Sequence, residues 1–240
     1  MRLIIIRKHW LSIISILLIL VIILTTALLY RNKYLAVISL PTTTKVIVID
    51  PGHGGFDPGK LGDKGEHEKA INLAISLYLR EYLEQSGSIV IMTREEDVDL
   101  YVDDGSGRRK KTIDLTNRKD IVTKNKPHAL ISIHVNSFPQ SRYHGAQTFY
   151  SEDNEESREL AIIILEELAR VLNEDNKREA LKNDDVYMIK GLDIPAVLIE
   201  CGFLSNPQEE QRLNDPQYQQ KIAWSIYVGL QRYLKMSFRE

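Results

Sequence analysis

The chain has 240 residues, with 31 Lys and Arg, 33 Asp and Glu and a formal net charge of −2. Residues 1–40 contain five basic residues and no acidic one, which leaves 26 basic and 33 acidic residues, a net charge of −7, for the rest of the chain. This acidic body argues against a nucleic-acid partner, which would require a basic surface. A hydrophobic fraction of 43% excludes a disordered chain, and the length after residue 40 suffices for one domain with a sizeable core.

An uncharged apolar segment at residues 11–29 is long enough to cross a bilayer, for which a helix needs about 20 residues. Three basic residues precede it and two follow, which favours a cytoplasmic N-terminus. A cleaved signal peptide has a shorter apolar run and a small-residue cleavage site, so an uncleaved signal-anchor is favoured. We therefore predict a signal-anchor or signal peptide at 1–30, a linker at 31–44 and a domain at 45–240.

Apolar runs alternate with helical patterns after residue 44. A buried strand is expected at 46–49 before a glycine-rich turn, and helical spacing of apolar residues predicts a helix at 68–85. Asp215 and Pro216 supply an N-cap and a first-turn proline for a last helix that ends near Leu234. The other expected elements are strands at 88–93, 129–135, 146–150, 186–189 and 196–201, helices at 114–124 and 155–172, and a polar loop at 101–112. This alternation predicts an α/β fold, a single layered domain whose mostly parallel twisted sheet is flanked by helices.

Chemically reactive side chains follow three of these strands. His53 lies in the turn after the first strand, and His134 and Glu200 lie near the ends of the 129–135 and 196–201 strands. The carboxyl ends of parallel strands meet at one edge of a sheet, and Glu68 begins a helix near that edge. Two histidines and a carboxylate with an open position for water are typical of catalytic zinc sites, and a second carboxylate can serve as general base. These residues predict a metal-dependent hydrolase.

Each of these residues also has a structural interpretation. His53 can be an ordinary loop histidine, His134 a hydrogen-bonded core histidine, and Glu68 an acid favoured at a helix N-terminus. Glu200 is harder to explain in this way, because a carboxylate that follows a run of apolar residues is costly to bury without a partner.

His67 competes with Glu68 as a metal ligand, because neighbouring helical residues point about 100° apart and only one of them can face the metal. Asp50 precedes the glycine-rich turn and is expected to orient it. The remaining histidines show no clustering and are expected to be structural or surface residues: His9, His128 and His144.

The single cysteine, Cys201, excludes an intramolecular disulfide and a zinc site built on several cysteines. Together with His134 it offers an alternative, a cysteine hydrolase. That alternative is disfavoured, because a nucleophilic cysteine needs surroundings that stabilise the thiolate, and Cys201 follows a buried strand beside an acid.

Four motifs in this order resemble the zinc-dependent N-acetylmuramoyl-L-alanine amidases of the amidase type 3 family, at residues 49–55, 68–73, 132–136 and 198–206. The resemblance extends over about residues 45–235. It implies that His53, Glu68 and His134 bind one zinc ion and that Glu200 is the general base. It also implies that the substrate is the amide between N-acetylmuramic acid and the L-alanine of peptidoglycan stem peptides.

Within the family, residues 91–100, 108–115 and 223–233 are most similar to germination-specific amidases of the spore cortex. This similarity implies that peptide removal precedes conversion of the sugar to muramic δ-lactam. It also implies export across the cytoplasmic membrane, with the domain anchored or secreted and facing the cell wall or cortex. Other zinc peptidoglycan hydrolases, a carboxypeptidase or a deacetylase, and an inactive wall-binding module are the alternatives.

Some amidases of this family carry an inserted helix that blocks the zinc, placed before the strand with the final glutamate. Here only residues 173–185 separate the 155–172 helix from the next apolar run, and they are mostly charged or polar. We therefore expect no built-in autoinhibition, so that control comes from the timing of expression or from an activating partner protein.

Overall fold

The computed structural model describes residues 8–38, 40–62, 65, 67–103, 105, 107–172 and 175–237. The chain divides into two compact units, Met1–Leu40 and Pro41–Glu240. In the first unit, helix α1 (Lys8–Ile38) contains a span, Trp10–Arg31, that is long and apolar enough to cross a membrane. The hydroxyls of Ser15, Thr25 and Thr26 donate to carbonyls of the same helix, which satisfies these polar groups internally, as a bilayer requires. The helix continues into the predicted linker, and the basic residues at positions 2 and 7 lie outside the described residues.

The second unit is built on a six-stranded sheet with the order β2-β1-β3-β6-β4-β5. The pairs β1–β2, β1–β3 and β3–β6 are parallel, whereas β4 runs antiparallel to β6. This confirms the predicted α/β fold with a mostly parallel sheet. The strands are β1 (Val46–Pro51), β2 (Ile89–Met92), β3 (Ala129–Asn136), β4 (Gln147–Tyr150), β5 (Leu181–Lys182) and β6 (Ala196–Phe203). The helices are α2 (Glu68–Gln85), α3 (Lys110–Asn125), α4 (Glu155–Leu172), α5 (Pro207–Leu213) and α6 (Pro216–Ser237).

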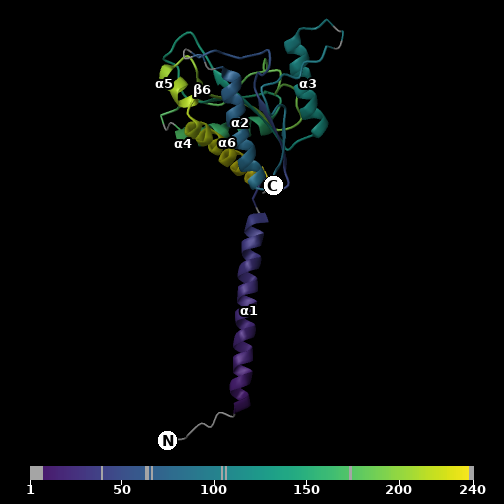
Figure 1. Cartoon of the computed structure of the whole chain (residues 1–240), viewed down its shortest axis with the longest axis vertical. Coiled ribbons are helices and arrows are strands. Elements are labelled where there is room, and N and C mark those ends of the chain that lie inside the picture. The colour runs from purple at the N-terminus through teal and green to yellow at the C-terminus, as the bar shows by residue number, and fades with distance from the viewer. Residues whose placement is uncertain are drawn as a thin grey trace. The chain divides into compact units, whose positions relative to one another are not determined.

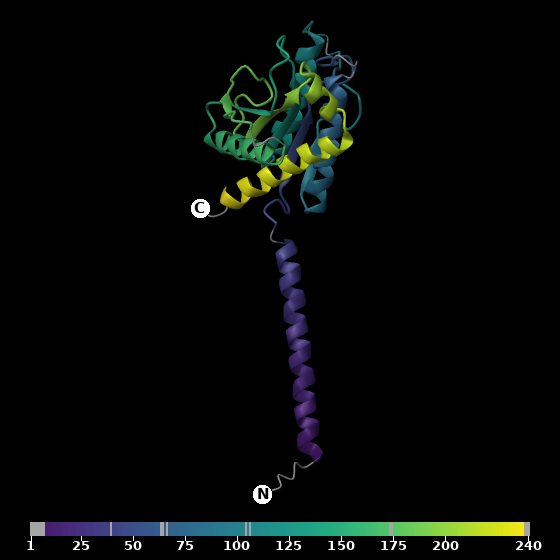
Figure 2. The same ribbon diagram turned by 90° about the vertical axis from the view of Figure 1, so that its left-hand side faces the viewer.

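Helices cover both faces of the sheet. Figures 1 and 2 show α6, in yellow, beside α2 and α4, while α3 lies across the sheet from them. Successive strand residues point to opposite faces, so Ile131 and Ile133 join the large core under α2, α4 and α6. Leu130 and Leu198 point the other way and pack with Val122 of α3. The even-numbered positions of β3 and β6 therefore face the α3 side.

The predicted strand at 186–189 is wrong. The carbonyl of Val186 accepts hydrogen bonds from the amides of Ile189 (3.3 Å) and Lys190 (3.1 Å), so the segment is a turn, and the edge strand is β5. Met188 and Ile189 are nevertheless buried in the core on the α3 side. Their apolar pattern indicates that they are buried. A short apolar run does not by itself distinguish a strand from another buried structure.

Two helices differ from their predictions. Helix α3 begins at Lys110, inside the predicted 101–112 loop, because its first turn is charged and exposed and carries no apolar periodicity. Helix α5 was not predicted, although its start signals are present. The Asn206 side chain accepts hydrogen bonds from the amides of Gln208 and Glu209, and Pro207 occupies the first helical position.

The end of the predicted linker belongs to the folded second unit. Thr42 is fully buried, and its hydroxyl lies 2.8 Å from the Ser86 hydroxyl. The amide group of Gln231 donates to the Thr42 hydroxyl (2.9 Å) and accepts from its backbone N–H (3.2 Å). These hydrogen bonds fix the chain just before β1 against α2 and α6.

Candidate metal centre

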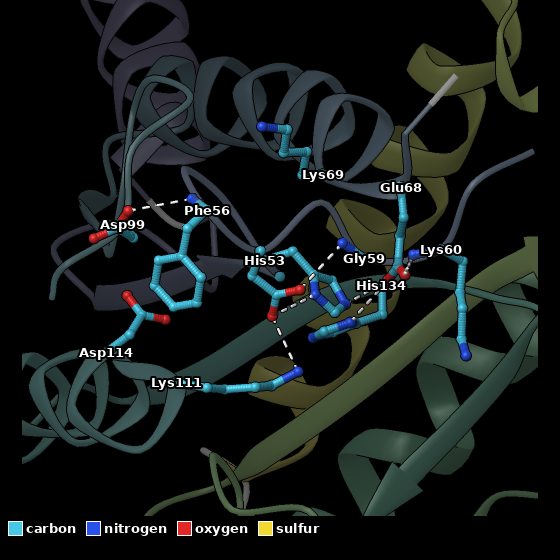
Figure 3. Close-up of polar contacts among 12 residues, drawn as sticks. His53, Phe56, Gly59, Lys60, Glu68, Lys69, Asp99, Lys111, Asp114 and His134 are labelled. Carbon is cyan, nitrogen blue, oxygen red and sulfur yellow. Dashed lines mark hydrogen bonds and ion pairs between the residues drawn. The ribbon is translucent and has the colours of Figure 1, made fainter. Parts of the chain in front are cut away.

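Three side chains from separate segments converge at the carboxyl edge of the sheet. Oε1 of Glu68, at the start of α2, lies 3.1 Å from Nε2 of His53, in the turn after β1, and 3.1 Å from Nδ1 of His134 on β3. One candidate ligand atom of each residue lies within 4.8 Å of the others. Figure 3 shows the two imidazoles and the carboxylate directed at one another. The structure thus brings together the three residues that the sequence singled out as metal ligands.

Glycine makes this close approach possible. A Cβ at Gly52 would lie 2.2 Å from the His134 ring, and one at Gly59 would lie 2.6 Å from Oε2 of Glu68. His53 itself has a φ of 61°, a left-handed conformation that is uncommon outside glycine. The glycine-rich turn therefore serves to seat His53 against the other two ligands.

Two buried arginines, which the sequence analysis did not assign to the site, hold this turn. Arg94 donates from Nε to the Pro51 carbonyl (3.0 Å) and from Nη2 to the Gly52 carbonyl (2.9 Å). Arg118 donates from Nη1 to the Pro51 carbonyl (2.9 Å) and from Nη2 to the His53 carbonyl (2.7 Å). The backbone that carries His53 is therefore held from two sides by rigid guanidinium groups.

Asp50 acts on the turn through Arg118 rather than by touching the His53 ring. Its carboxylate lies 3.1 Å from Nη1 of Arg118 and accepts from the hydroxyls of Thr93 (2.6 Å) and Ser132 (2.8 Å). Burial opposes ionisation, but the Arg118 charge and the two hydroxyls outweigh it and lower the pKa of Asp50. Asp114 pairs with Arg118 from one turn earlier on α3 (2.9 Å). The spacing of four residues on a helix was the signal in the sequence for this ion pair.

Glu68 is an ionised acid at the centre of the cluster. Its carboxylate accepts from the amides of Lys60 (2.9 Å) and Val135 (3.3 Å) and from the side chain of Asn72 (3.2 Å). Burial opposes its charge, but hydrogen bonding with His134 and His53 prevails and lowers its pKa. For His134, burial opposes protonation, and the interaction with Glu68 outweighs burial and raises its pKa. The pair therefore favours an ionised Glu68 carboxylate and a positively charged group beside it.

Glu200 stands beside the cluster on the neighbouring strand. It pairs with His134 in the β3–β6 register, so both side chains project toward the α3 side of the sheet. Its Oε2 atom is buried and has no hydrogen-bond partner among the residues that the structure describes. Burial, opposed by His134 and reinforced by the charge of Glu68, raises the pKa of Glu200 to about 7. A carboxyl group with this pKa can exchange protons near neutral pH.

The cysteine alternative does not fit the structure. Cys201 packs into the core under α2, α4 and α6, on the face of the sheet opposite to His134 and Glu200. Burial and the charge of Glu200 raise the pKa of its thiol well above the usual value. A buried, protonated thiol that points away from the histidines is not a nucleophile for this site.

The remaining histidines take other places. His67 occupies the N-cap position of α2 and lies outside the group of His53, Glu68 and His134 that could hold a metal ion. Nδ1 of His128 accepts from the Val46 amide (3.1 Å) at the opposite end of β1 and β3, so it is structural as expected. His144 is exposed in the connection between β3 and β4. The side chain of His9 lies outside the described residues.

A cavity of about 170 Å³ borders His53 and His134. One part of its wall is polar and includes Lys111 and Tyr187. The apolar part of its wall consists of Leu115, Val186, Met188 and Leu198. The segment mistaken for a strand at 186–189 thus forms a side of the space next to the cluster.

A family model described as N-acetylmuramoyl-L-alanine amidase, Amidase_3, matches residues 47–232. The germination-specific N-acetylmuramoyl-L-alanine amidase of Bacillus subtilis (strain 168) is 42% identical over 196 residues, which cover 81% of this chain and 82% of that protein.

Solved structures agree with this match. The CwlD amidase from Clostridioides difficile, in complex with the GerS lipoprotein, is 50% identical with a TM-score of 0.78, over 80% of this chain and 100% of that one. The amidase AmiC2 of Nostoc punctiforme is 26% identical with a TM-score of 0.69, over 80% of this chain and 97% of that one.

Proposed function

We propose that this chain, which belongs to the N-acetylmuramoyl-L-alanine amidase family, uses zinc to hydrolyse the amide between N-acetylmuramic acid and L-alanine in spore cortex peptidoglycan. The observation that carries the proposal is the convergence of His53, Glu68 and His134, with Glu200 beside them. The similarity to a germination-specific amidase supports the cortex as the substrate.

The donor set fits zinc. Two imidazole nitrogens and one carboxylate oxygen are common zinc ligands, and three protein ligands leave a fourth position for water or substrate. Magnesium and calcium prefer sites built from oxygen atoms alone. His53, Glu68 and His134 would hold the ion, which when bound supplies Lewis acidity toward the scissile carbonyl and makes water more acidic.

Glu200 would move the proton in this reaction. It accepts a proton from the attacking water as the water oxygen bonds to the lactyl carbonyl carbon. It then delivers that proton to the nitrogen of L-alanine as the carbon–nitrogen bond breaks. The products are a free lactyl carboxylate on the sugar and a stem peptide with a free amino terminus. The cavity beside His53 and His134 offers room for the groups on one side of the scissile bond.

The first unit supports the proposal that the enzyme is exported and anchored in the membrane. The exposed apolar span of α1 has the length and composition of a signal-anchor, so we place the domain on the outer side of the cytoplasmic membrane, facing the wall or cortex. The CwlD amidase forms a complex with a lipoprotein, and we propose that a partner protein also acts on this chain. The described residues 175–195 contain β5 and turns, and we propose that control comes from outside the domain rather than from an internal plug.

Product analysis tests the proposal. The full-length chain in detergent is incubated with purified cortex peptidoglycan, with zinc or with a chelator, and the products are identified by mass spectrometry. We expect stem peptides with a free N-terminal L-alanine, formed only with zinc. Released D-amino acid would indicate a carboxypeptidase, released acetate a deacetylase, and binding without any product a wall-binding module.

A further inference from the structure

Asp57 lies against the ring nitrogen of His53 that faces away from the cluster. Nε2 of His53 is directed at Glu68 (3.1 Å), and Nδ1, on the other edge of the ring, lies 3.0 Å from Oδ2 of Asp57. Nδ1 is buried and forms no hydrogen bond with the residues that the structure describes, so the Asp57 oxygen is a nearby acceptor that it can use. Metal-binding histidines generally donate the N–H of their second nitrogen to an acceptor such as a carboxylate, which fixes the tautomer and the plane of the ring.

The carboxylate of Asp57 is itself held in place. Its Oδ1 accepts from the backbone N–H of Gly59 (3.2 Å), and its Oδ2 lies 3.0 Å from Nζ of Lys111. Backbone hydrogen bonds in both directions join Asp57 to Gly54 (2.9 and 3.0 Å). Figure 3 shows Lys111 reaching from α3 toward His53. A carboxylate fixed from α3 and from its own turn can determine how the imidazole is oriented.

A second acid supports the same turn without contacting the ring. Asp97 accepts from the amide of Gly55 (2.9 Å) and pairs with Lys69 (2.7 Å). Its side chain is 56% exposed, against 20% for Asp57. Asp97 therefore shares the role of a loop support with Asp57 but lacks the contact with His53, which makes it a matched control.

We propose that Asp57 is a positioning residue of the metal centre, which accepts the Nδ1 proton of His53 and so presents the Nε2 lone pair to zinc. This inference rests on the proposed zinc site and adds to it a residue that does not bind the metal itself. Lys111 keeps the Asp57 carboxylate at the edge of the ring through its ion pair with Oδ2.

The test is the zinc dissociation constant of the full-length chain in detergent, measured by competition with a chromophoric chelator. We expect Asp57→Ala to weaken zinc binding about 10- to 100-fold, the usual effect of removing such an acceptor. Asp57→Asn, which keeps an acceptor oxygen but no charge, should lose less zinc affinity than Asp57→Ala. Asp97→Asn should bind zinc within about twofold of the wild type, since the contacts of Asp97 are with Gly55 and Lys69 rather than with a proposed ligand. Thermal unfolding of the metal-free variants verifies that each is folded.

The outcomes separate this inference from the zinc site on which it rests. If His53→Ala loses zinc while Asp57→Ala binds it as the wild type does, the role of Asp57 is wrong and the metal centre remains. An equal loss in Asp97→Asn would assign the effect to the loop and also overturn the proposal. A wild-type chain that binds no zinc would overturn the metal centre itself.

Discussion

The two faces of strand β3 differ in chemistry toward its carboxyl end. Ile131 and Ile133 point into an apolar core that α2, α4 and α6 close. Ser132 and His134 point to the α3 side, where they meet Asp50 and Glu68. Because strand side chains alternate between faces, one strand supplies stability on one side and reactivity on the other. Substitutions on the two faces should therefore separate loss of folding from loss of chemistry.

Glu68→Ala should have the largest effect on activity. It removes the one carboxylate among the proposed ligands, so zinc binding fails, and turnover should fall at least about 10³-fold, which corresponds to several kcal/mol of lost transition-state stabilisation. Turnover of cortex peptidoglycan and zinc content by atomic spectroscopy measure the two effects. Full activity without bound zinc would contradict the claim that the polar face of β3 acts by holding zinc.

Arg118→Met tests whether the buried ion pairs on the polar face also stabilise the fold. Arg118 is 1% exposed and pairs with Asp50 and Asp114, and its removal leaves buried carboxylates without their cation. The free energy of unfolding should fall by about 3–5 kcal/mol, as measured by urea titration. Arg80→Met, which breaks the partly exposed pair with Glu95 (2.8 Å), is the control and should cost less than about 1 kcal/mol.

Glu200→Gln should stabilise the metal-free protein above neutral pH. The folded-state pKa of Glu200 is raised from 4.5 to about 7, so the folded protein favours the protonated carboxyl and loses stability as the pH rises from 4.5 to 7. The neutral amide avoids this loss. Because Glu200 is partly exposed, we expect a gain of at most about 3 kcal/mol at pH 8 and none at pH 4. Urea titrations at both pH values with a chelator present measure this, and a gain that is equal at both would contradict the assigned pKa.

Ile133→Val, on the core face, should have the smallest effect. Ile133 is fully buried, and the loss of one methylene should lower the free energy of unfolding by about 1 kcal/mol. Turnover and zinc affinity should remain within about twofold of the wild type, because the side chain points away from His134. A tenfold loss of zinc affinity in this variant would show that the two faces are coupled.

The sequence could predict that the four proposed site residues lie together, because each has a local signal. His53, His134 and Glu200 follow apolar strands, and the carboxyl ends of parallel strands meet at one edge. For Arg118 the four-residue spacing from Asp114 predicted only a helical ion pair, because its contact with His53 spans 65 residues of chain and depends on how α3 packs. The error at 186–189 has a related cause, because Met188 is buried by a tertiary contact and an apolar run alone does not distinguish a turn from a strand.

The division of roles between Glu68 and Glu200 is the central claim, and Glu200→Gln tests it most directly. Zinc content and cleavage of cortex peptidoglycan are measured on the same preparation of the full-length chain. Our account predicts one zinc ion per chain, as in the wild type, with cleavage reduced about 10²- to 10⁴-fold, the usual contribution of a general acid–base group. Loss of zinc together with retained cleavage would show that Glu200 is a ligand and not the base, and would contradict the account.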